Sequence, residues 1–125
     1  MKYTFKVAIT TAVFLYCTAS IAQSKYCLSF QGQNDSSAQI QITMNGVIAA
    51  ADAVGSRYPS ACGILGQFNN PTYTAVAVLN NRETLQCGEA NFYGQNPPYS
   101  INIYVSVPGN GESARCSIEG LAVPL

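Results

Sequence analysis

Residues 101–107 read Ile101-Asn102-Ile103-Tyr104-Val105-Ser106-Val107, and this stretch decides the fold class. Aliphatic side chains occupy the odd positions, whereas polar or amphipathic side chains occupy the even ones. Because successive side chains of a β-strand point to opposite faces, this period of two predicts a strand with one buried and one exposed face. Similar alternation occurs around residues 39–44 and 113–119. The chain is therefore expected to be mainly β.

Turn residues separate further candidate strands. Residues 72–79 are apolar on both faces, which predicts the most buried strand of the domain. Asn80-Asn81 follows and predicts a tight turn into a strand over 82–92, since asparagine tolerates positive φ. Residues 26–30 predict another short strand with Cys27 on its polar face, so that a disulfide at a sheet edge is expected.

The segment 47–57 is compatible with two structures. Asn45-Gly46 before it is a two-residue hairpin signal and predicts a returning strand. Alternatively, the segment is rich in alanine, its apolar residues share a helical face, and Gly55 and Pro59 are helix-stop signals. We expect the hairpin, because the preceding strand needs a partner. The expected fold is a small antiparallel β-sandwich or barrel of about six strands, stapled by two disulfides, with an α+β fold containing one short helix near 47–57 as the alternative.

The first 22 residues have the features of a secretory signal peptide. Lys2 and Lys6 form a basic start, residues 7–16 are apolar, and Ser20-Ile21-Ala22 offers small residues at a cleavage site. The apolar stretch is too short to span a bilayer. We therefore expect a signal peptide at 1–22 and a single secreted domain at 23–125, with no membrane attachment after cleavage. The bacterial periplasm is the alternative location.

Four of the five cysteines lie beyond the signal peptide, at Cys27, Cys62, Cys87 and Cys116. An even number in a short exported chain predicts two disulfides, formed in an oxidising compartment. Sequence allows three pairings; we expect Cys27–Cys116 between the terminal strands and Cys62–Cys87 at the central loop. The chain has no CxxC spacing and no histidine, which argues against a zinc site, so no metal and no cofactor are expected.

Charge is sparse in residues 23–125. The cations are Lys25, Arg57, Arg82 and Arg115, and the anions are Asp35, Asp52, Glu83, Glu89, Glu112 and Glu119. Four scattered cations cannot neutralise a phosphate backbone or an anionic membrane surface. The sequence therefore argues against nucleic-acid and membrane partners.

The residue inventory also argues against catalysis. Without histidine, Ser-His-Asp and Cys-His chemistry is excluded, and cysteines held in disulfides leave no thiolate nucleophile. Glu83 and Glu89 share a face of one expected strand but lie roughly 20 Å apart along it. A glycosidase pair needs roughly 5–10 Å. We expect the protein not to be an enzyme.

Two loop-like segments, residues 57–73 and 91–99, concentrate aromatic and amide side chains. Tyrosine beside amide residues suits protein interfaces, because each ring offers a large contact area at low cost in rotamer entropy. The same rings can stack on sugars, and Pro97-Pro98 stiffens the second loop, which lowers the cost of ordering on binding. The alternative for each ring is a place over the end of the core. The candidate binding residues are Arg57, Tyr58, Phe68, Asn69, Asn70, Tyr73, Phe92, Tyr93, Gln95, Asn96 and Tyr99.

A leader, a small β-rich body, two disulfides and no catalytic set together resemble the small secreted effector proteins of fungal pathogens. The resemblance covers composition and cysteine count, and it implies non-catalytic binding of a host protein. Two other classes have the same outline. One is a periplasmic inhibitor or immunity protein that blocks an enzyme, and the other is a carbohydrate-binding module. The expected partner is thus an unidentified protein, with a glycan as the alternative.

Overall fold

The computed structural model describes residues 23–66 and 68–122, so the expected signal peptide lies outside the described residues. The described chain forms eight strands and no helix. In chain order the strands are β1 (Lys25–Gly32), β2 (Ser37–Met44), β3 (Val47–Gly55), β4 (Ser60–Ile64), β5 (Thr72–Leu79), β6 (Thr84–Asn91), β7 (Tyr99–Val107) and β8 (Arg115–Ala122).

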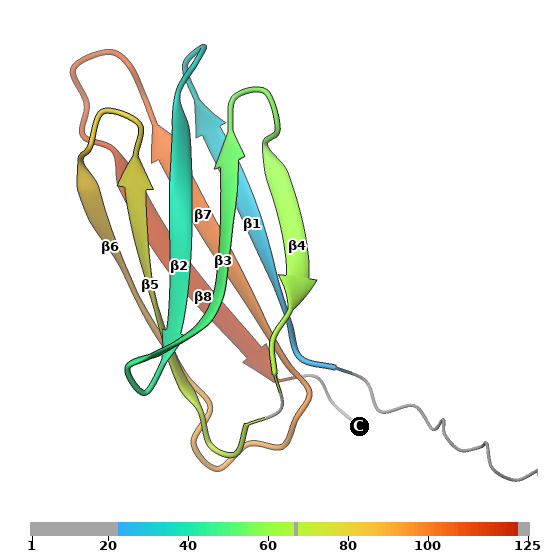
Figure 1. Ribbon diagram of the computed structural model, residues 1–125. Helices are drawn as coiled ribbons and strands as arrows, with labels where there is room; N and C mark the ends of the chain where they lie inside the picture. Colours follow the sequence, from blue (N-terminus) through green and yellow to red (C-terminus); the bar gives the residue numbers. More distant parts are fainter. Residues whose placement is uncertain (1–22, 67, 123–125) are drawn as a thin grey trace, which may run out of the picture.

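The strands form two four-stranded sheets packed face to face, which confirms the predicted β-sandwich (Figure 1). One sheet has the order β4-β1-β7-β8 and the other the order β3-β2-β5-β6. Neighbouring strands run antiparallel except β1 and β7, which are parallel. The described chain has eight strands, whereas about six were expected. One reason is that the five-residue β4 lacks the apolar alternation that would predict a strand.

The alternation predicted for residues 101–107 is present in β7. Ile101, Ile103 and Val105 are buried between the sheets, while Tyr104 is exposed on the outer face. The prediction for 72–79 was wrong in part, because β5 buries one face only. Its outer face carries a half-buried Val76 and an exposed Val78, since no further layer covers this sheet.

The two predicted hairpins are confirmed, and the helical alternative for 47–57 is wrong. Asn45 and Gly46 have φ values of 53° and 85°, as a two-residue turn with two left-handed positions requires, and β3 returns along β2. The turn after β5 is longer than expected. Leu79 and Glu83 close it by a backbone hydrogen bond of 2.8 Å, and the positive φ falls on Arg82 rather than on an asparagine.

Both disulfides form, but the expected pairing was wrong. Cys27 bonds to Cys62, which lies directly opposite on the edge strand β4. Cys87 on β6 bonds to Cys116 on β8 and so joins the two sheets. Cys27 and Cys116 cannot meet, because β7 lies between their strands and because Cys27 faces outward whereas Cys116 faces the interior. The predicted disulfide at a sheet edge is confirmed.

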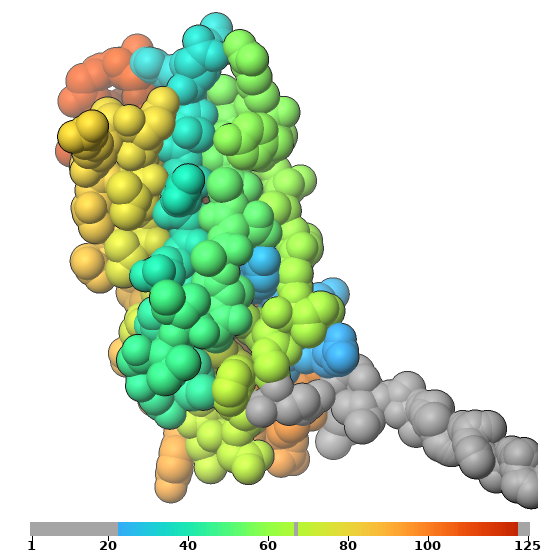
Figure 2. All heavy atoms as spheres, in the orientation of Figure 1, coloured from blue at the N-terminus to red at the C-terminus, as the bar shows by residue number. Residues whose placement is uncertain are grey.

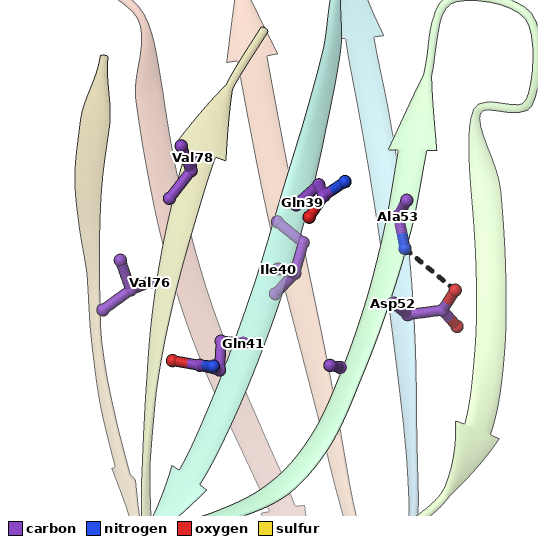
Figure 3. Close-up of a pocket in the computed structure, with 8 residues that line it drawn as sticks. Gln39, Ile40, Gln41, Asp52, Ala53, Val76 and Val78 are labelled. Atoms are coloured by element: carbon purple, nitrogen blue, oxygen red, sulfur yellow. Dashed lines mark hydrogen bonds between the residues drawn. The ribbon is translucent and has the colours of Figure 1, made fainter. Parts of the chain in front are cut away.

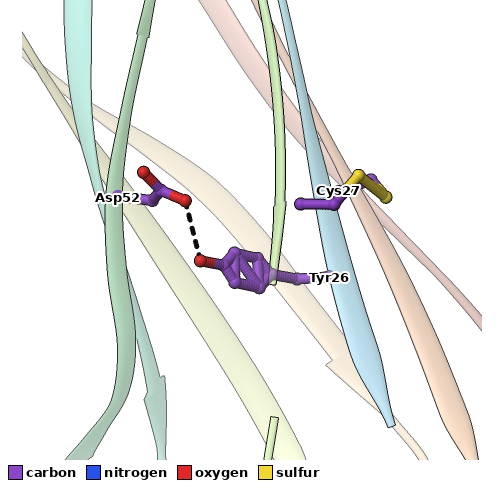
Figure 4. Close-up of a disulfide and its surroundings, with 4 residues drawn as sticks. Tyr26, Cys27 and Asp52 are labelled. Carbon is purple, nitrogen blue, oxygen red and sulfur yellow. Dashed lines mark hydrogen bonds between the residues drawn. A yellow bond between two sulfur atoms is a disulfide. The ribbon is translucent and has the colours of Figure 1, made fainter. Parts of the chain in front are cut away.

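The two open sides of the sandwich are closed differently. The disulfide Cys87–Cys116 holds β6 against β8 on one side. On the other side Tyr26 of β1 reaches across to Asp52 of β3 (Figure 4).

Disulfides indicate an oxidising location outside the cytoplasm. Among the described residues, no helix is long and apolar enough to cross a membrane.

Candidate binding surface

The sandwich separates the sequence-predicted binding residues into two groups at opposite ends. Arg57 and Tyr58 lie in the connection between β3 and β4, at the end that also holds the β5–β6 turn (Figure 1). The other candidates lie in or beside the β4–β5 loop (65–71) and the β6–β7 loop (92–98), which meet at the opposite end. The structure therefore does not form one surface from all of them.

Three of the predicted binding residues belong to the core. Tyr73, Phe92 and Tyr99 are each at most 2% exposed, so the expectation that they contact a partner is corrected. Their rings follow one another with centroids 6.0 Å and 4.5 Å apart, and the half-buried Phe68 adds an edge contact of 6.4 Å with Tyr73. These four rings cover the end of the hydrophobic core that lies beneath the two loops.

The sequence contained a signal for two of these buried positions. Tyr99 has the same parity as Ile101 and Val105 in β7, so it continues their buried face. Tyr73 likewise continues the buried face of β5. Burial raises the pKa of Tyr73 to about 12, with a smaller contribution from the neighbouring Tyr99. Its buried hydroxyl meets no hydrogen-bond partner among the described residues.

Tyr93 is the ring that this end presents to solvent, with 78% of its surface exposed. The loop beneath it is fixed by short hydrogen bonds. The amide oxygen of Asn91 accepts from Tyr93 N at 2.9 Å, and that of Asn70 accepts from Gly94 N at 2.9 Å. Gln95 N donates to Phe92 O at 3.0 Å, and Gln95 O accepts from the Tyr99 hydroxyl at 2.7 Å. Tyr93 thus projects from a backbone that is already ordered.

We call this end the amide end. Figure 2 shows atoms of both loops gathered at one extremity of the molecule. Neither loop contains a charged residue. The exposed amide side chains around Tyr93 are Asn69, Asn70, Asn91, Gln95 and Asn96. The surface can therefore offer one aromatic face together with amide donors and acceptors.

The opposite end carries a smaller polar group. Arg57 Nη2 lies 3.1 Å from Asp35 Oδ1, with both side chains largely exposed. An exposed ion pair of this kind contributes about 1 kcal/mol or less. Tyr58 beside it is half exposed, and its backbone is paired with Gly55 at 3.1 Å in both directions. These residues form a separate surface, remote from Tyr93.

A hollow that the sequence did not predict lies on the outer face of β3, β2 and β5 (Figure 3). It has a volume of about 560 Å³, and most of its lining consists of glutamine amides and small apolar side chains. Asp52 also borders it, but its carboxylate is held by Tyr26 and by its neighbour Ala53 N at 2.8 Å. The alternation of glutamine with isoleucine in 39–42 was the available signal for this face. The remaining lining residues are Gln39, Ile40, Gln41, Ala51, Ala53, Val76 and Val78.

In the part of the chain that the structure describes, no group of three or more histidine, cysteine, aspartate or glutamate residues could hold a metal ion. No protein-family model, curated protein or solved structure matches this chain. Function is therefore inferred from the surfaces themselves.

Proposed function

We propose that this protein is a secreted, non-catalytic binding protein of effector type that engages a host protein through the amide end. The observation that carries the proposal is the exposure of Tyr93 on a loop already fixed by hydrogen bonds. Tyrosine is enriched among the residues that dominate protein interfaces. A rigid loop loses little conformational entropy when it binds, so more of the contact energy contributes to affinity.

The chemistry of the amide end supports a partner surface that is not strongly charged. Both loops lack charged residues, so long-range electrostatic attraction contributes little there. Recognition would rest on burial of the Tyr93 ring and on hydrogen bonds to the surrounding amides. Secretion is supported by the predicted signal peptide and by the two disulfides.

The same loop favours one second candidate, an inhibitor that inserts Tyr93 and its amide neighbours into the active site of an enzyme. A projecting, uncharged loop suits such a role as well as it suits binding to another host protein. A sugar-binding platform is less well supported, since such platforms use several exposed rings. At the amide end Tyr73, Phe92 and Tyr99 are buried, and Phe68 is half buried.

The test is capture of partners with the oxidised domain, residues 23–125, from host extracellular fluid and lysate, alongside a glycan array. The captured partner is then titrated against three purified forms of the domain. We expect Tyr93→Ala to weaken binding about tenfold or more. This factor corresponds to a loss of about 1.4 kcal/mol or more of binding free energy, as expected for an important interface residue. Tyr104→Ala is the matched control, because Tyr104 is an exposed tyrosine on the outer face of β7.

Equal affinity of the wild type and Tyr93→Ala would contradict the proposed surface. A glycan ligand without any saturable protein partner would contradict the proposed function. Inhibition of a captured enzyme would select the inhibitor, whereas capture of a partner without catalytic activity would select the effector.

A further inference from the structure

The two disulfides differ in their access to solvent. Cys27 and Cys62 lie on the outer face of the sheet, where Cys62 is exposed and Cys27 is half buried. Figure 4 shows Cys27 directed away from Tyr26, which points between the sheets. Cys87 is only 5% exposed and faces the interior together with the half-buried Cys116. A reductant can therefore reach the first disulfide in the folded protein more easily than the second.

We propose that Cys27–Cys62 is a reducible disulfide that acts as a latch on β4. The reductant is a dithiol of the thioredoxin class, and it attacks at Cys62. Exposed disulfides are the ones that exchange readily, and exchange depends on access to the attacked sulfur. Cys62 is accessible because β4 is the last strand of its sheet and because its side chain is on the exposed outer face.

The exchange proceeds in two balanced steps. A thiolate of the dithiol attacks Cys62 Sγ, forms a mixed disulfide and breaks the bond to Cys27, which leaves as a thiolate and takes up a proton. The second thiol of the reductant, once deprotonated, attacks the mixed disulfide and releases Cys62, which is protonated in turn. Two electrons and two protons pass to the protein, and the reductant leaves as its own disulfide.

Reduction would loosen β4 more than any other strand. β4 has five residues and pairs with β1 alone within its sheet. Backbone hydrogen bonds of 2.8 Å, from Phe30 N to Pro59 O and from Leu65 N to Ser24 O, flank its ends. The opposite side of the sandwich would keep its covalent clamp, Cys87–Cys116. The expected product is a folded sandwich with one released edge strand.

Release of β4 would uncover the residue beneath it. Gly63 of β4 lies against Tyr26 so closely that a Cβ at this position would collide with the Tyr26 ring and hydroxyl. Departure of β4 therefore exposes Tyr26 and its hydrogen bond to Asp52 to solvent. The latch does not depend on the amide end, so the two proposals are tested separately.

The first test measures which disulfide is reduced. The oxidised domain, residues 23–125, is exposed to thioredoxin with its reductase and NADPH, quenched with iodoacetamide at intervals and mapped by peptide mass spectrometry. We expect Cys27 and Cys62 to be alkylated about tenfold faster or more than Cys87 and Cys116. The same reaction in urea should lose this preference, because unfolding exposes both disulfides. Equal rates in the folded protein, or faster reduction of Cys87–Cys116, would overturn the proposal.

The second test asks whether the reduced strand is released. Amide hydrogen exchange is compared between the oxidised protein, the selectively reduced protein and the variant Cys27→Ser/Cys62→Ser. We expect exchange in residues 60–64 to rise about tenfold or more while β2 and β5 stay protected. Unchanged exchange in β4 would rule out the latch, and loss of protection throughout the chain would rule out local release. The variant Cys87→Ser/Cys116→Ser is the matched control and should not expose β4 selectively.

Discussion

The hydroxyl of Tyr26 on β1 donates a hydrogen bond of 2.8 Å to Asp52 on β3, and this contact joins the two sheets on the side opposite the Cys87–Cys116 disulfide (Figure 4). Burial, together with the hydrogen bond and the negative charge of Asp52, raises the pKa of Tyr26 to about 12. Both sides of the sandwich thus have a connection between the sheets, which is covalent on one side and a hydrogen bond on the other.

Removal of the Tyr26 hydroxyl should destabilise the fold. We expect Tyr26→Phe to lower the free energy of unfolding by about 1–3 kcal/mol, because a hydrogen bond to a carboxylate is lost in a partly buried place. Urea denaturation measures this difference. Tyr73→Phe is the control and should change stability little, since its hydroxyl has no partner among the described residues. Equal stability of Tyr26→Phe and the wild type would show that the contact is energetically neutral.

Addition of a methyl group at Gly63 should disturb the same side of the sandwich. Gly63→Ala places its Cβ against the Tyr26 ring and hydroxyl, so Tyr26 or β4 must shift. We expect a loss of about 1–3 kcal/mol in the free energy of unfolding, as for other overpacked sites. Ser60→Ala, at an exposed position of the same strand, should stay within about 0.5 kcal/mol of the wild type. Similar results for the two variants would mean that β4 does not pack closely on Tyr26.

Stability should decrease in alkaline solution because of two buried tyrosines. The pKa values of Tyr26 and Tyr73 are raised from 10.0 to about 12 on folding, so the unfolded chain loses these protons first. Their contribution is therefore complete below pH 10 and is lost as the pH rises toward 12. The slope should approach about 1.4 kcal/mol per pH unit for each tyrosine. Urea titrations across this range should show it, and the double variant Tyr26→Phe/Tyr73→Phe should lose most of the slope.

Tyr93 and Tyr99 should respond oppositely to truncation, although both lie near the β6–β7 loop. Tyr99→Ala removes a buried ring and should cost about 3–5 kcal/mol of unfolding free energy. Tyr93→Ala removes an exposed ring and should change stability by about 0.5 kcal/mol or less. Thermal unfolding followed by circular dichroism compares the two. Strong destabilisation by Tyr93→Ala would assign Tyr93 to the core and remove it from the contact surface.

The order of the β6–β7 loop should depend on Asn70. Its side chain accepts a hydrogen bond from Gly94 N, and its φ of 50° favours asparagine or glycine. Asn70→Gly keeps this backbone conformation and removes only the acceptor. We expect the Gly94 amide to exchange with solvent about tenfold faster or more, as seen by NMR, while amides of β2 are unchanged. Equal exchange at Gly94 would show that the loop is held without Asn70.

Features that depend on neighbouring residues could be predicted from the sequence, and those that depend on strand order could not. Asn45-Gly46 specified its turn because both residues accept a left-handed backbone. The cysteine pairing failed because it depends on β7 lying between β1 and β8, a long-range arrangement that no local pattern encodes.

The candidate binding surface was predicted only in part for a related reason. Composition pointed to both loops, although the first loop-like segment, 57–73, also contains β4. A shift of one residue in a strand turns a side chain from solvent to core. Tyr99 continues the buried face of β7, whereas Tyr93 lies beyond β6 in a turn whose Gly94 N donates a hydrogen bond to Asn70, a residue of the other loop. Arg57 and Tyr58 were grouped with them by composition, although the fold places them at the opposite end.

The parallel pairing of β1 with β7 has a consequence for the order of events during folding. The first strand of the domain finds its central neighbour only after residues 99–107 exist, and β4 pairs with β1. By contrast, the other sheet consists of two hairpins, β2–β3 and β5–β6, joined by the antiparallel pairing of β2 with β5. Closing a long loop costs conformational entropy before the distant strands gain any contact free energy. The sheet containing β1 should therefore assemble late and slowly. If the protein is secreted as proposed, a chain that is crossing a membrane cannot complete this sheet until residues 99–107 have crossed.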